Sequence, residues 1–393
     1  MMTKNKLCMR VIVFSITIML VLCILLSNRF ILSKAYAMPD SENVSVLAPA
    51  RGMVLLEGNT NTVLYEYNAD TQLPMASTTK IITAIVAIEN CADLDKEFVI
   101  SDKAVGIEGT SIYLKSGETM TMRKLLYGLI LASGNDCAVA IAEEVCGYDN
   151  FVNKMNEFVN ALGLKNTCLK NPHGLDEDGH YTSAHDLAVI TSYALNNSTF
   201  REIVGTKRHV IEGNGDIQPR YLKHKNKLMF MDDKCIGVKT GFTDNAGRCL
   251  VSAYEDKDML LISVVLNCQP MFEECDRLTK CALGEYTMCE FVKPYNFVSD
   301  IDVKNGDKQN VSVVAVLGYK IPVKNSEKKY YHVDYEFPSE LVAPVKQNSV
   351  VGSVKVRYKD NVLFEGDLYC IDSSDSIDLK YYFDNILNNW GVR

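Results

Sequence analysis

A serine and a lysine three residues apart are the first residues of this chain whose types and spacing could carry out catalysis. In the stretch Pro74-Met-Ala-Ser-Thr-Thr-Lys-Ile-Ile-Thr-Ala-Ile-Val-Ala-Ile-Glu-Asn90, Ser77 and Lys80 stand at the start of an apolar run. The run predicts a buried helix over residues 78–89, and positions three apart share one face of a helix. A serine hydroxyl needs a neighbouring base, and a lysine whose pKa is lowered by burial can act as that base. The pair is therefore a candidate nucleophile and general base, although a capping serine followed by a solvated lysine has the same spacing.

Two further motifs favour the catalytic interpretation. Ser133-Gly134-Asn135 lies between two helical patterns, and Lys239-Thr240-Gly241 lies at the end of a strand pattern. Each motif alone is common. In this order, Ser-x-x-Lys, Ser-x-Asn and Lys-Thr-Gly form a set close to that of class A β-lactamases and penicillin-binding proteins. Together they predict acyl transfer through an ester on the serine of the first motif.

The elements that must position these motifs are a sheet and a group of helices. Apolar residues at strand or helix spacing predict a hairpin over 53–67, helices over 78–89, 122–131, 136–145 and 150–162, and strands over 237–240, 248–254 and 259–266. The strands come from both ends of this region and the helices from its middle. The fold class is therefore predicted to be α+β.

The region from Ala50 to Phe291 resembles the serine D-alanyl-D-alanine carboxypeptidases, which are low-molecular-mass penicillin-binding proteins. Besides the three motifs, the segments that carry the resemblance are residues 59–65, 108–113, 126–129, 171–176 and 247–251. Residues 127–136 and 171–176 look most similar to the Gram-positive, partly sporulation-associated branch. The resemblance implies a β-lactamase/transpeptidase-like domain, an antiparallel sheet flanked by helices, followed by a small all-β sandwich domain.

The resemblance also implies roles for individual residues. Ser77 would attack the carbonyl of the penultimate D-alanine of a peptidoglycan stem peptide, Lys80 would take its proton, and Ser133 would relay a proton to the leaving nitrogen. β-Lactams mimic the D-alanyl-D-alanine end and would acylate the same serine. No metal or organic cofactor is implied.

Substrate binding would fall to residues of the second and third motifs. These are Asn135, Lys239, Thr240 and Gly241, and the backbone amides of Ser77 and Phe242 would form the oxyanion hole. Lys225 is a weaker candidate for the terminal carboxylate, since a solvated surface lysine is an equally good interpretation.

The remaining boundaries follow from composition. A positively charged start, an apolar run over 11–26 and Ala35-Tyr36-Ala37 predict a signal peptide over 1–37, followed by a linker over 38–50. The catalytic domain is predicted over 51–293. Alternating runs after Pro294 predict a β-sandwich over 294–372, and the amphipathic tail over 373–393 fits either a membrane-surface helix or one docked on its own domain.

Net charge and cysteine use limit the partners and the setting. The net charge of -8, with no basic block, argues against nucleic acid. We expect an exported enzyme at the cell wall or the outer face of the cytoplasmic membrane. Two of the 13 cysteines, Cys8 and Cys23, lie in the predicted leader, which leaves an odd number that we interpret as buried thiols.

Four alternatives make different demands on the sequence. A Ser-His-Asp hydrolase is disfavoured because no Gly-x-Ser-x-Gly motif occurs. A class A β-lactamase needs a glutamate between the second and third motifs, and residues 170–176 do not supply it in the expected setting. A metallopeptidase is suggested by the cluster His173, Asp176, Asp178, His180, His185 and Asp186, but no His-Glu-x-x-His helix is present. A catalytically idle wall-binding or β-lactam-sensing protein is disfavoured, because every motif residue is retained.

Overall fold

The computed structural model describes residues 50–213 and 215–389. The predicted signal peptide over 1–37 and nearly all of the predicted linker over 38–50 lie outside the described residues. Among the described residues, no helix is both long enough and apolar enough to cross a bilayer.

An antiparallel five-stranded sheet forms the centre of the first folded region, in the order β2-β1-β9-β8-β7. Its strands are β1 (Gly52–Glu57), β2 (Thr62–Tyr67), β7 (Cys235–Thr243), β8 (Gly247–Asp256) and β9 (Met259–Leu266). All six residues of β1 and all eight of β9 are buried, which is why these strands are continuously apolar instead of alternating. The predicted hairpin and the α+β fold class are confirmed.

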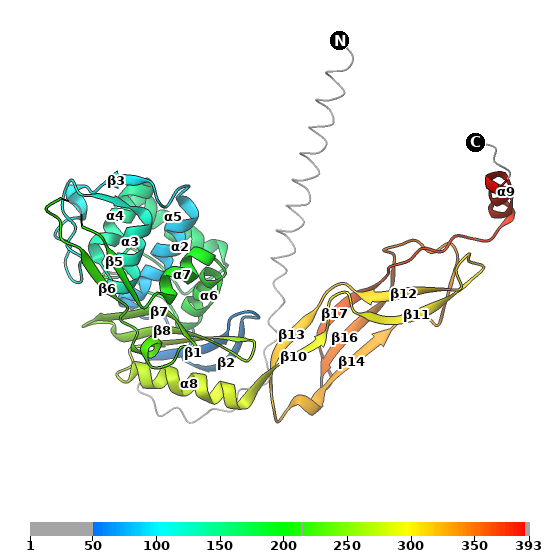
Figure 1. The fold of residues 1–393 in the computed structure, drawn as a ribbon. Coiled ribbons are helices and arrows are strands. Elements are labelled where there is room, and N and C mark those ends of the chain that lie inside the picture. Colours follow the sequence, from blue (N-terminus) through cyan, green and yellow to red (C-terminus); the bar gives the residue numbers. More distant parts are fainter. Residues whose placement is uncertain (1–49, 214, 390–393) are drawn as a thin grey trace, which may run out of the picture. The chain divides into compact units, whose positions relative to one another are not determined.

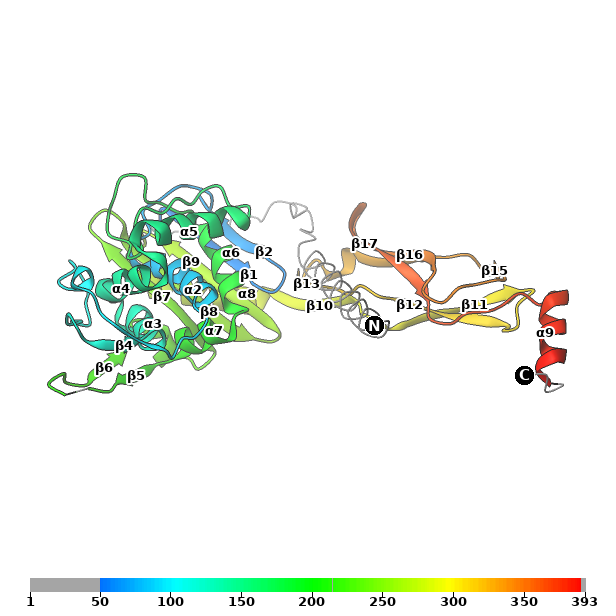
Figure 2. The ribbon, with the colours of Figure 1, turned by 90° about the horizontal axis from the view of Figure 1, so that it is seen from above.

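Helices cover both faces of this sheet. Figure 1 shows α8 (Met271–Glu285) on one face and the remaining helices on the other. The helices of the second group are α2 (Lys80–Asn90), α3 (Met122–Tyr127), α4 (Asn135–Cys146), α5 (Tyr148–Ala161), α6 (Ala184–Leu195) and α7 (Ser198–Gly205). In Figure 2, α2 lies in the middle of this group, and it contacts α4, α5, α6 and α7. Its first eight residues are all buried, as expected for a helix that neighbours surround.

Short elements join these layers. They are the 3-10 helices Ala76–Thr79, Asp102–Ala104 and Lys227–Phe230, a π-helical turn over Gly128–Ala132, the pair β3 (Glu97–Val99) and β4 (Thr119–Thr121), and the hairpin of β5 (Arg208–Ile211) and β6 (Arg220–Lys223). Our sequence analysis did not identify the two short strand pairs or α6, α7 and α8. The start of α6 does carry a signal, because the Ser183 side chain accepts a hydrogen bond from the Asp186 amide at 3.1 Å.

The C-terminal region consists mainly of strands, as predicted. A six-stranded sheet has the order β14-β16-β17-β12-β11-β15, and β10 pairs with β13 in a second, two-stranded sheet. The bounds are β10 (Tyr286–Val292), β11 (Phe297–Lys304), β12 (Asn310–Ala315), β13 (Tyr319–Lys324), a 3-10 turn (Lys328–Tyr330), β14 (Tyr331–Glu336), β15 (Glu340–Val342), β16 (Val350–Tyr358), β17 (Asn361–Cys370) and α9 (Leu379–Asn389).

The domain boundary between residues 293 and 294 stays a prediction. β10 precedes it in sequence but pairs with β13, which follows it. The core of the C-terminal region, with Val311, Val313, Val354, Val356 and Leu368, is separate from the clusters around the five-stranded sheet.

Candidate active site

Ser77 lies in the short 3-10 helix that leads into α2. Its side chain is partly exposed, whereas the neighbouring residues Ala76 and Thr79 are buried. Ala76 has a φ of 48°, which is uncommon for a residue other than glycine, and Thr79 Oγ1 donates to the Ala76 carbonyl at 2.8 Å. The turn therefore presents the Ser77 hydroxyl to solvent at the start of a buried helix.

Lys80 is the first residue of α2, and its ammonium nitrogen meets three oxygen atoms. Nζ lies 2.9 Å from Ser77 Oγ, 2.7 Å from Asn135 Oδ1 and 2.6 Å from the His173 carbonyl oxygen. The side chain is fully buried. Burial, together with a smaller contribution from the charge of Lys225, lowers the pKa of Lys80 to about 7.

A second serine and lysine pair lies beside the first. Lys239 of β7 is buried, and its Nζ donates to Ser133 Oγ at 2.9 Å and to the Thr240 carbonyl at 2.8 Å. Ser133 ends the π-helical turn with a φ of 66° and is also buried. Burial holds the pKa of Lys239 well below its usual value, and the charges of Lys80 and Lys225 act in the same direction.

The loop over residues 171–176 brings the His173 carbonyl to Lys80. Asn171 Oδ1 accepts the Gly174 amide at 2.7 Å, which closes a tight turn. Gly174 has a φ of 88°, and a Cβ at this position would lie 2.0 Å from the Ala76 carbonyl oxygen. Only glycine fits between this loop and the turn that carries the nucleophile.

The histidines of this loop act as neutral, hydrogen-bonded groups. Burial lowers the pKa of His173 to about 3 and that of His180 to about 4, and repulsion from Lys80 contributes to both shifts. His180 Nε2 lies 2.9 Å from Thr79 Oγ1, and its Nδ1 accepts the Lys170 amide at 3.0 Å. Uncharged His180 therefore supports the turn around Ser77 through Thr79, whereas the His173 ring accepts the Leu175 amide at 3.2 Å.

The metallopeptidase hypothesis finds little geometric support. In the described part of the chain, one set of His, Cys, Asp or Glu side chains has three ligand atoms within 4.8 Å of one another, namely Asp70, His185 and Asp186. That set includes two of the six candidates but neither histidine near Ser77. The absence of a catalytic metal remains an expectation from sequence.

Strand β7 runs along the other side of Ser77. A Cβ on Gly241 would lie 3.1 Å from the Ser77 backbone nitrogen and 3.0 Å from the Met75 carbonyl oxygen, so the strand approaches this turn closely. Thr240 is partly exposed, and Phe242 is 58% exposed with the Arg248 guanidinium 5.6 Å from its ring centre. An extended peptide could lie along this exposed end of β7.

The structure thus brings together the residues of all three motifs. Ser77, Lys80 and Asn135 are hydrogen-bonded, Ser133 and Lys239 form a second pair, and Gly241 contacts the turn of Ser77. Lys225 is solvent-exposed but close enough to affect the pKa values of both buried lysines.

Comparison with known proteins identifies the family. The family model for D-alanyl-D-alanine carboxypeptidase, peptidase family S11, matches residues 40–270, which is more than half of the chain. This chain belongs to that family. The model for the C-terminal domain of penicillin-binding protein 5 matches residues 286–375.

Individual relatives extend over both regions. The chain is 31% identical to D-alanyl-D-alanine carboxypeptidase DacF of Bacillus subtilis over 91% of this chain and 94% of that protein. It is 33% identical to DacA of Escherichia coli over 87% and 89% of the two chains. The crystal structure of penicillin-binding protein 5 from Haemophilus influenzae matches 86% of this chain and 99% of its own, with a TM-score of 0.70 and 25% identity.

These findings confirm that the chain is a serine-type D-alanyl-D-alanine carboxypeptidase, a hydrolase of the penicillin-binding-protein type. They favour this interpretation over the class A β-lactamase and the idle sensor. The predicted fold class, a penicillin-binding domain followed by a C-terminal β-domain, is confirmed as well.

Our sequence analysis missed several groups that shape the site. It grouped His173 with candidate metal ligands, but the contact with Lys80 is made by its backbone carbonyl. It assigned no role to Asp136, whose buried carboxylate accepts several backbone amides, or to Arg220. Asp136 directly follows the Ser-x-Asn motif and begins the helix predicted over 136–145, but this position alone did not indicate which amides its carboxylate accepts. Arg220 offered no signal, because it lies in a polar stretch far from every motif.

Proposed function

We propose that this carboxypeptidase removes the terminal D-alanine of peptidoglycan stem peptides through an acyl-enzyme on Ser77, with Lys80 as general base. The single observation that carries the assignment of roles is the set of three oxygen atoms around Lys80 Nζ. A neutral amine has two protons and one lone pair. Asn135 Oδ1 and the His173 carbonyl can only accept, so they take the two protons, and the lone pair remains for the Ser77 hydroxyl proton.

The pKa of Lys80, about 7, supports this proton transfer. At neutral pH a substantial fraction of the amine is unprotonated, and it lies 2.9 Å from the hydroxyl that it must activate. As Ser77 Oγ bonds to the substrate carbonyl carbon, its proton moves to Lys80 and the carbonyl oxygen becomes an oxyanion. Two backbone amides, those of Ser77 and Phe242, are proposed to stabilise it, at roughly 3 kcal/mol for each donor.

Collapse of this intermediate breaks the peptide bond. Ser133 is proposed to relay to the leaving nitrogen the proton that Lys80 took from Ser77, because the Ser133 oxygen already accepts a bond from Lys239 and its own proton is free to donate. This transfer returns Lys80 to the neutral form. Terminal D-alanine leaves as the amine. Water then adds to the ester carbonyl with loss of a proton to Lys80, and breakage of the ester restores the Ser77 hydroxyl and releases the shortened peptide.

Substrate recognition is assigned to strand β7 and its surroundings. Asn135, Thr240 and Gly241 are proposed to hold the peptide backbone and the terminal carboxylate, with Lys239 and Lys225 as its positive partners. Partial loss of hydration lowers the pKa of Lys225, which is consistent with a position at the edge of the site. β-Lactams are proposed to acylate Ser77 in place of the peptide.

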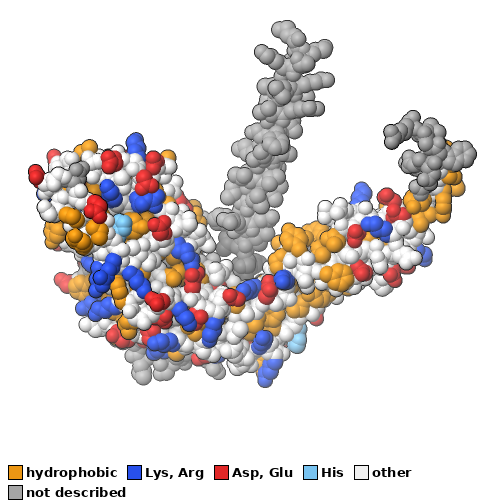
Figure 3. Space-filling model, in the orientation of Figure 1, with side chains coloured by type: hydrophobic (Ala, Val, Ile, Leu, Met, Phe, Trp, Pro, Cys, Tyr) orange, Lys and Arg blue, Asp and Glu red, His pale blue; other side chains and the backbone are white. Residues whose placement is uncertain are grey.

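We also propose that the protein acts outside the cytoplasm and contacts the membrane through α9. Leu379, Phe383 and Ile386 share one face of this helix, and their side chains are 90%, 62% and 53% exposed. Figure 3 shows hydrophobic side chains on the surface near the C-terminal end of the described chain. Exposure of this face favours the membrane-surface alternative over a helix docked on its own domain.

The test is release of free D-alanine from diacetyl-L-lysyl-D-alanyl-D-alanine by the purified protein. We expect release by the wild type, none by Ser77→Ala, and undiminished release by Ser101→Ala, an exposed serine outside the site. Release that persists in Ser77→Ala would refute the assignment of the nucleophile. Absence of release from folded wild-type protein would refute the proposed substrate.

A further inference from the structure

Arg220 of β6 makes a nearly buried ion pair that the catalytic motifs do not explain. Its guanidinium lies 2.5 Å from Glu118 Oε1, and the two side chains are only 11% and 4% exposed. The same guanidinium donates to the Ile112 carbonyl at 2.8 Å and to the Tyr113 carbonyl at 3.0 Å. A buried ion pair contributes little net stability, because desolvation offsets most of the attraction. The arrangement therefore suggests a role in positioning.

The segment that Arg220 contacts is held from its other side by Asp136. The Asp136 carboxylate accepts the amides of Ile112 and Leu114, at 3.1 and 3.0 Å, and the hydroxyl of Ser111 at 2.6 Å. The N–H groups of this segment thus face an anion at the start of α4, whereas two of its carbonyl groups face a cation on β6. The segment has two charged anchors, which come from different elements.

The same segment sets the orientation of Asn135. Asn135 Nδ2 donates to the Glu108 carbonyl at 2.6 Å, and the Asn135 amide donates to the Thr110 carbonyl at 2.6 Å. A Cβ on Gly109 would lie 2.8 Å from Asn135 Nδ2, so the contact is close. Because Nδ2 faces Glu108, Oδ1 must face Lys80, where it accepts at 2.7 Å.

We propose that Arg220 is a positioning residue of the active site, which acts by holding the segment 108–118 against Asn135. The proposal rests on the roles proposed above for Ser77, Lys80 and Asn135. When the anchor is lost, the Glu108 carbonyl withdraws, the Asn135 amide is free to rotate, and Lys80 loses the oxygen that directs its lone pair toward Ser77. Acylation then slows although no group that touches the substrate has changed.

The primary test is the acylation rate of Arg220→Gln with a fluorescent penicillin. The rate is expressed per site that saturating penicillin finally labels, so that misfolded protein does not count. We expect a decrease of at least about tenfold, since displacements near 1 Å can cost about a hundredfold. Arg220→Lys should recover only part of the rate, because an ammonium cannot reach a carboxylate and two carbonyls in one plane. Arg357→Gln, which removes an ion pair with Asp334 in the C-terminal sheet, should keep the full rate.

A double-mutant cycle shows whether the effect passes through Asn135. In the Asn135→Ala background, Arg220→Gln should change the rate per site less than about twofold, because the coupling is already lost. An equal decrease in both backgrounds, or an unchanged rate in the single variant, would overturn the proposal. If Arg220→Gln does not fold, Glu118→Gln takes its place in the same cycle, with the same expected and overturning results.

The same experiment separates this proposal from the one on which it rests. Labelling that persists in Ser77→Ala would contradict the proposed nucleophile, and with it the positioning role. Labelling that requires Ser77 but does not depend on Arg220 would contradict the positioning role alone.

Discussion

Gly174 is the position where a single methyl group should most directly disturb catalysis. Its φ of 88° is strained for an L-residue, and a Cβ would lie 2.0 Å from the Ala76 carbonyl oxygen. Relief of this overlap to an ordinary van der Waals contact of at least 3.4 Å needs a shift of more than about 1 Å. The loop carries the His173 carbonyl, so Gly174→Ala should move that acceptor away from Lys80 or displace the turn that holds Ser77.

The magnitude follows from the geometry of the hydrogen bond. The bond from Lys80 to the His173 carbonyl measures 2.6 Å, and a displacement near 1 Å would break it. We expect the second-order rate constant for acylation to fall by about a hundredfold. The assay is time-resolved labelling with a fluorescent penicillin, with the rate expressed per finally labelled site.

Gly147 provides the matched control for this substitution. It has a φ of 87°, but a Cβ at this position meets no atom within 4 Å. Gly147→Ala and Gly174→Ala both place an alanine at a positive φ, at a cost of roughly 1–3 kcal/mol, and they differ in the collision with the nucleophile turn. Equal acylation rates in the two folded variants would refute the reasoning, because strain alone would then account for both.

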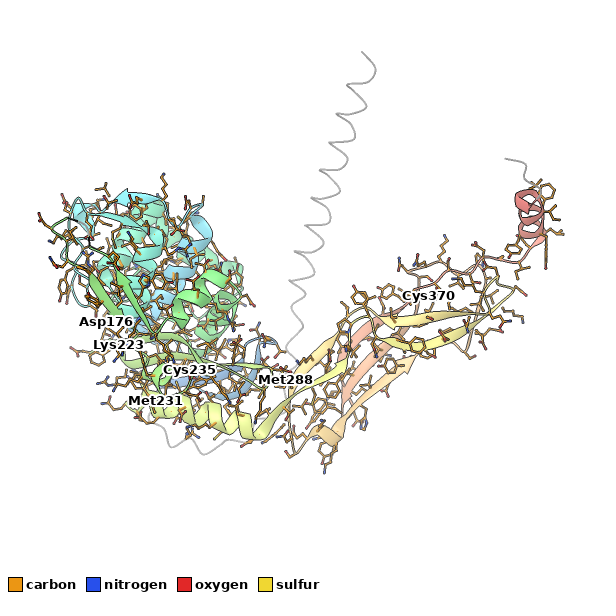
Figure 4. All side chains as sticks on the ribbon, in the orientation of Figure 1. Asp176, Lys223, Met231, Cys235, Met288 and Cys370 are labelled. Atoms are coloured by element: carbon orange, nitrogen blue, oxygen red, sulfur yellow. The ribbon has the colours of Figure 1, made fainter. Side chains whose placement is uncertain are left out.

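Three further predictions concern charge and surface. If Lys80 is the base, acylation requires its neutral form, so the acylation rate should rise about tenfold from pH 6 to pH 8 and level off at higher pH, since the pKa of Lys80 is about 7. An acylation rate that does not change over this range would contradict the proposed base. Lys225→Ala should raise KM for the peptide about tenfold, and it should move this pH profile to higher pH because Lys225 lowers the pKa of Lys80. The control is Lys223→Ala, which changes an exposed lysine on β6 that Figure 4 labels and should have neither effect. Phe383→Asp should weaken binding to anionic lipid vesicles in a sedimentation assay. Phe297→Asp, which replaces a similarly exposed phenylalanine of the C-terminal sheet, should not weaken it. Loss of binding in both variants would point to a general effect of charge.

The sequence predicted which residues would meet at the candidate site because they belong to short motifs. Ser77 and Lys80 lie one helical turn apart, so local geometry alone brings them together. The hydrogen bond between Lys239 and Ser133 spans 106 residues, and the resemblance to a known family indicated only that the two residues belong to one site. The sheet was predictable from its apolar strands, because β1 and β9 are buried on both faces.

What the sequence could not show was the structure that supports these groups. The His173 contact is made by a backbone carbonyl, which any residue type could supply, and its position depends on the space that Gly174 leaves. The Arg220 and Glu118 pair spans 102 residues between two short, polar elements that carry no strong periodicity. Such contacts depend on how loops pack, and loop packing leaves little trace in composition or spacing.

The pKa of Lys80, the proposed base, must be lowered more by burial than by charge repulsion, because substrate binding changes the repulsion. A substrate carboxylate bound beside Lys225 would neutralise part of the repulsion that Lys225 exerts on Lys80. If repulsion alone lowered the pKa of Lys80, substrate binding would protonate the base at the moment when it is needed. Because burial is the largest cause of the shift, Lys80 keeps a lowered pKa while the carboxylate is bound. Departure of D-alanine would then remove that negative charge, and the restored repulsion would favour neutral Lys80 for the proposed attack of water on the ester.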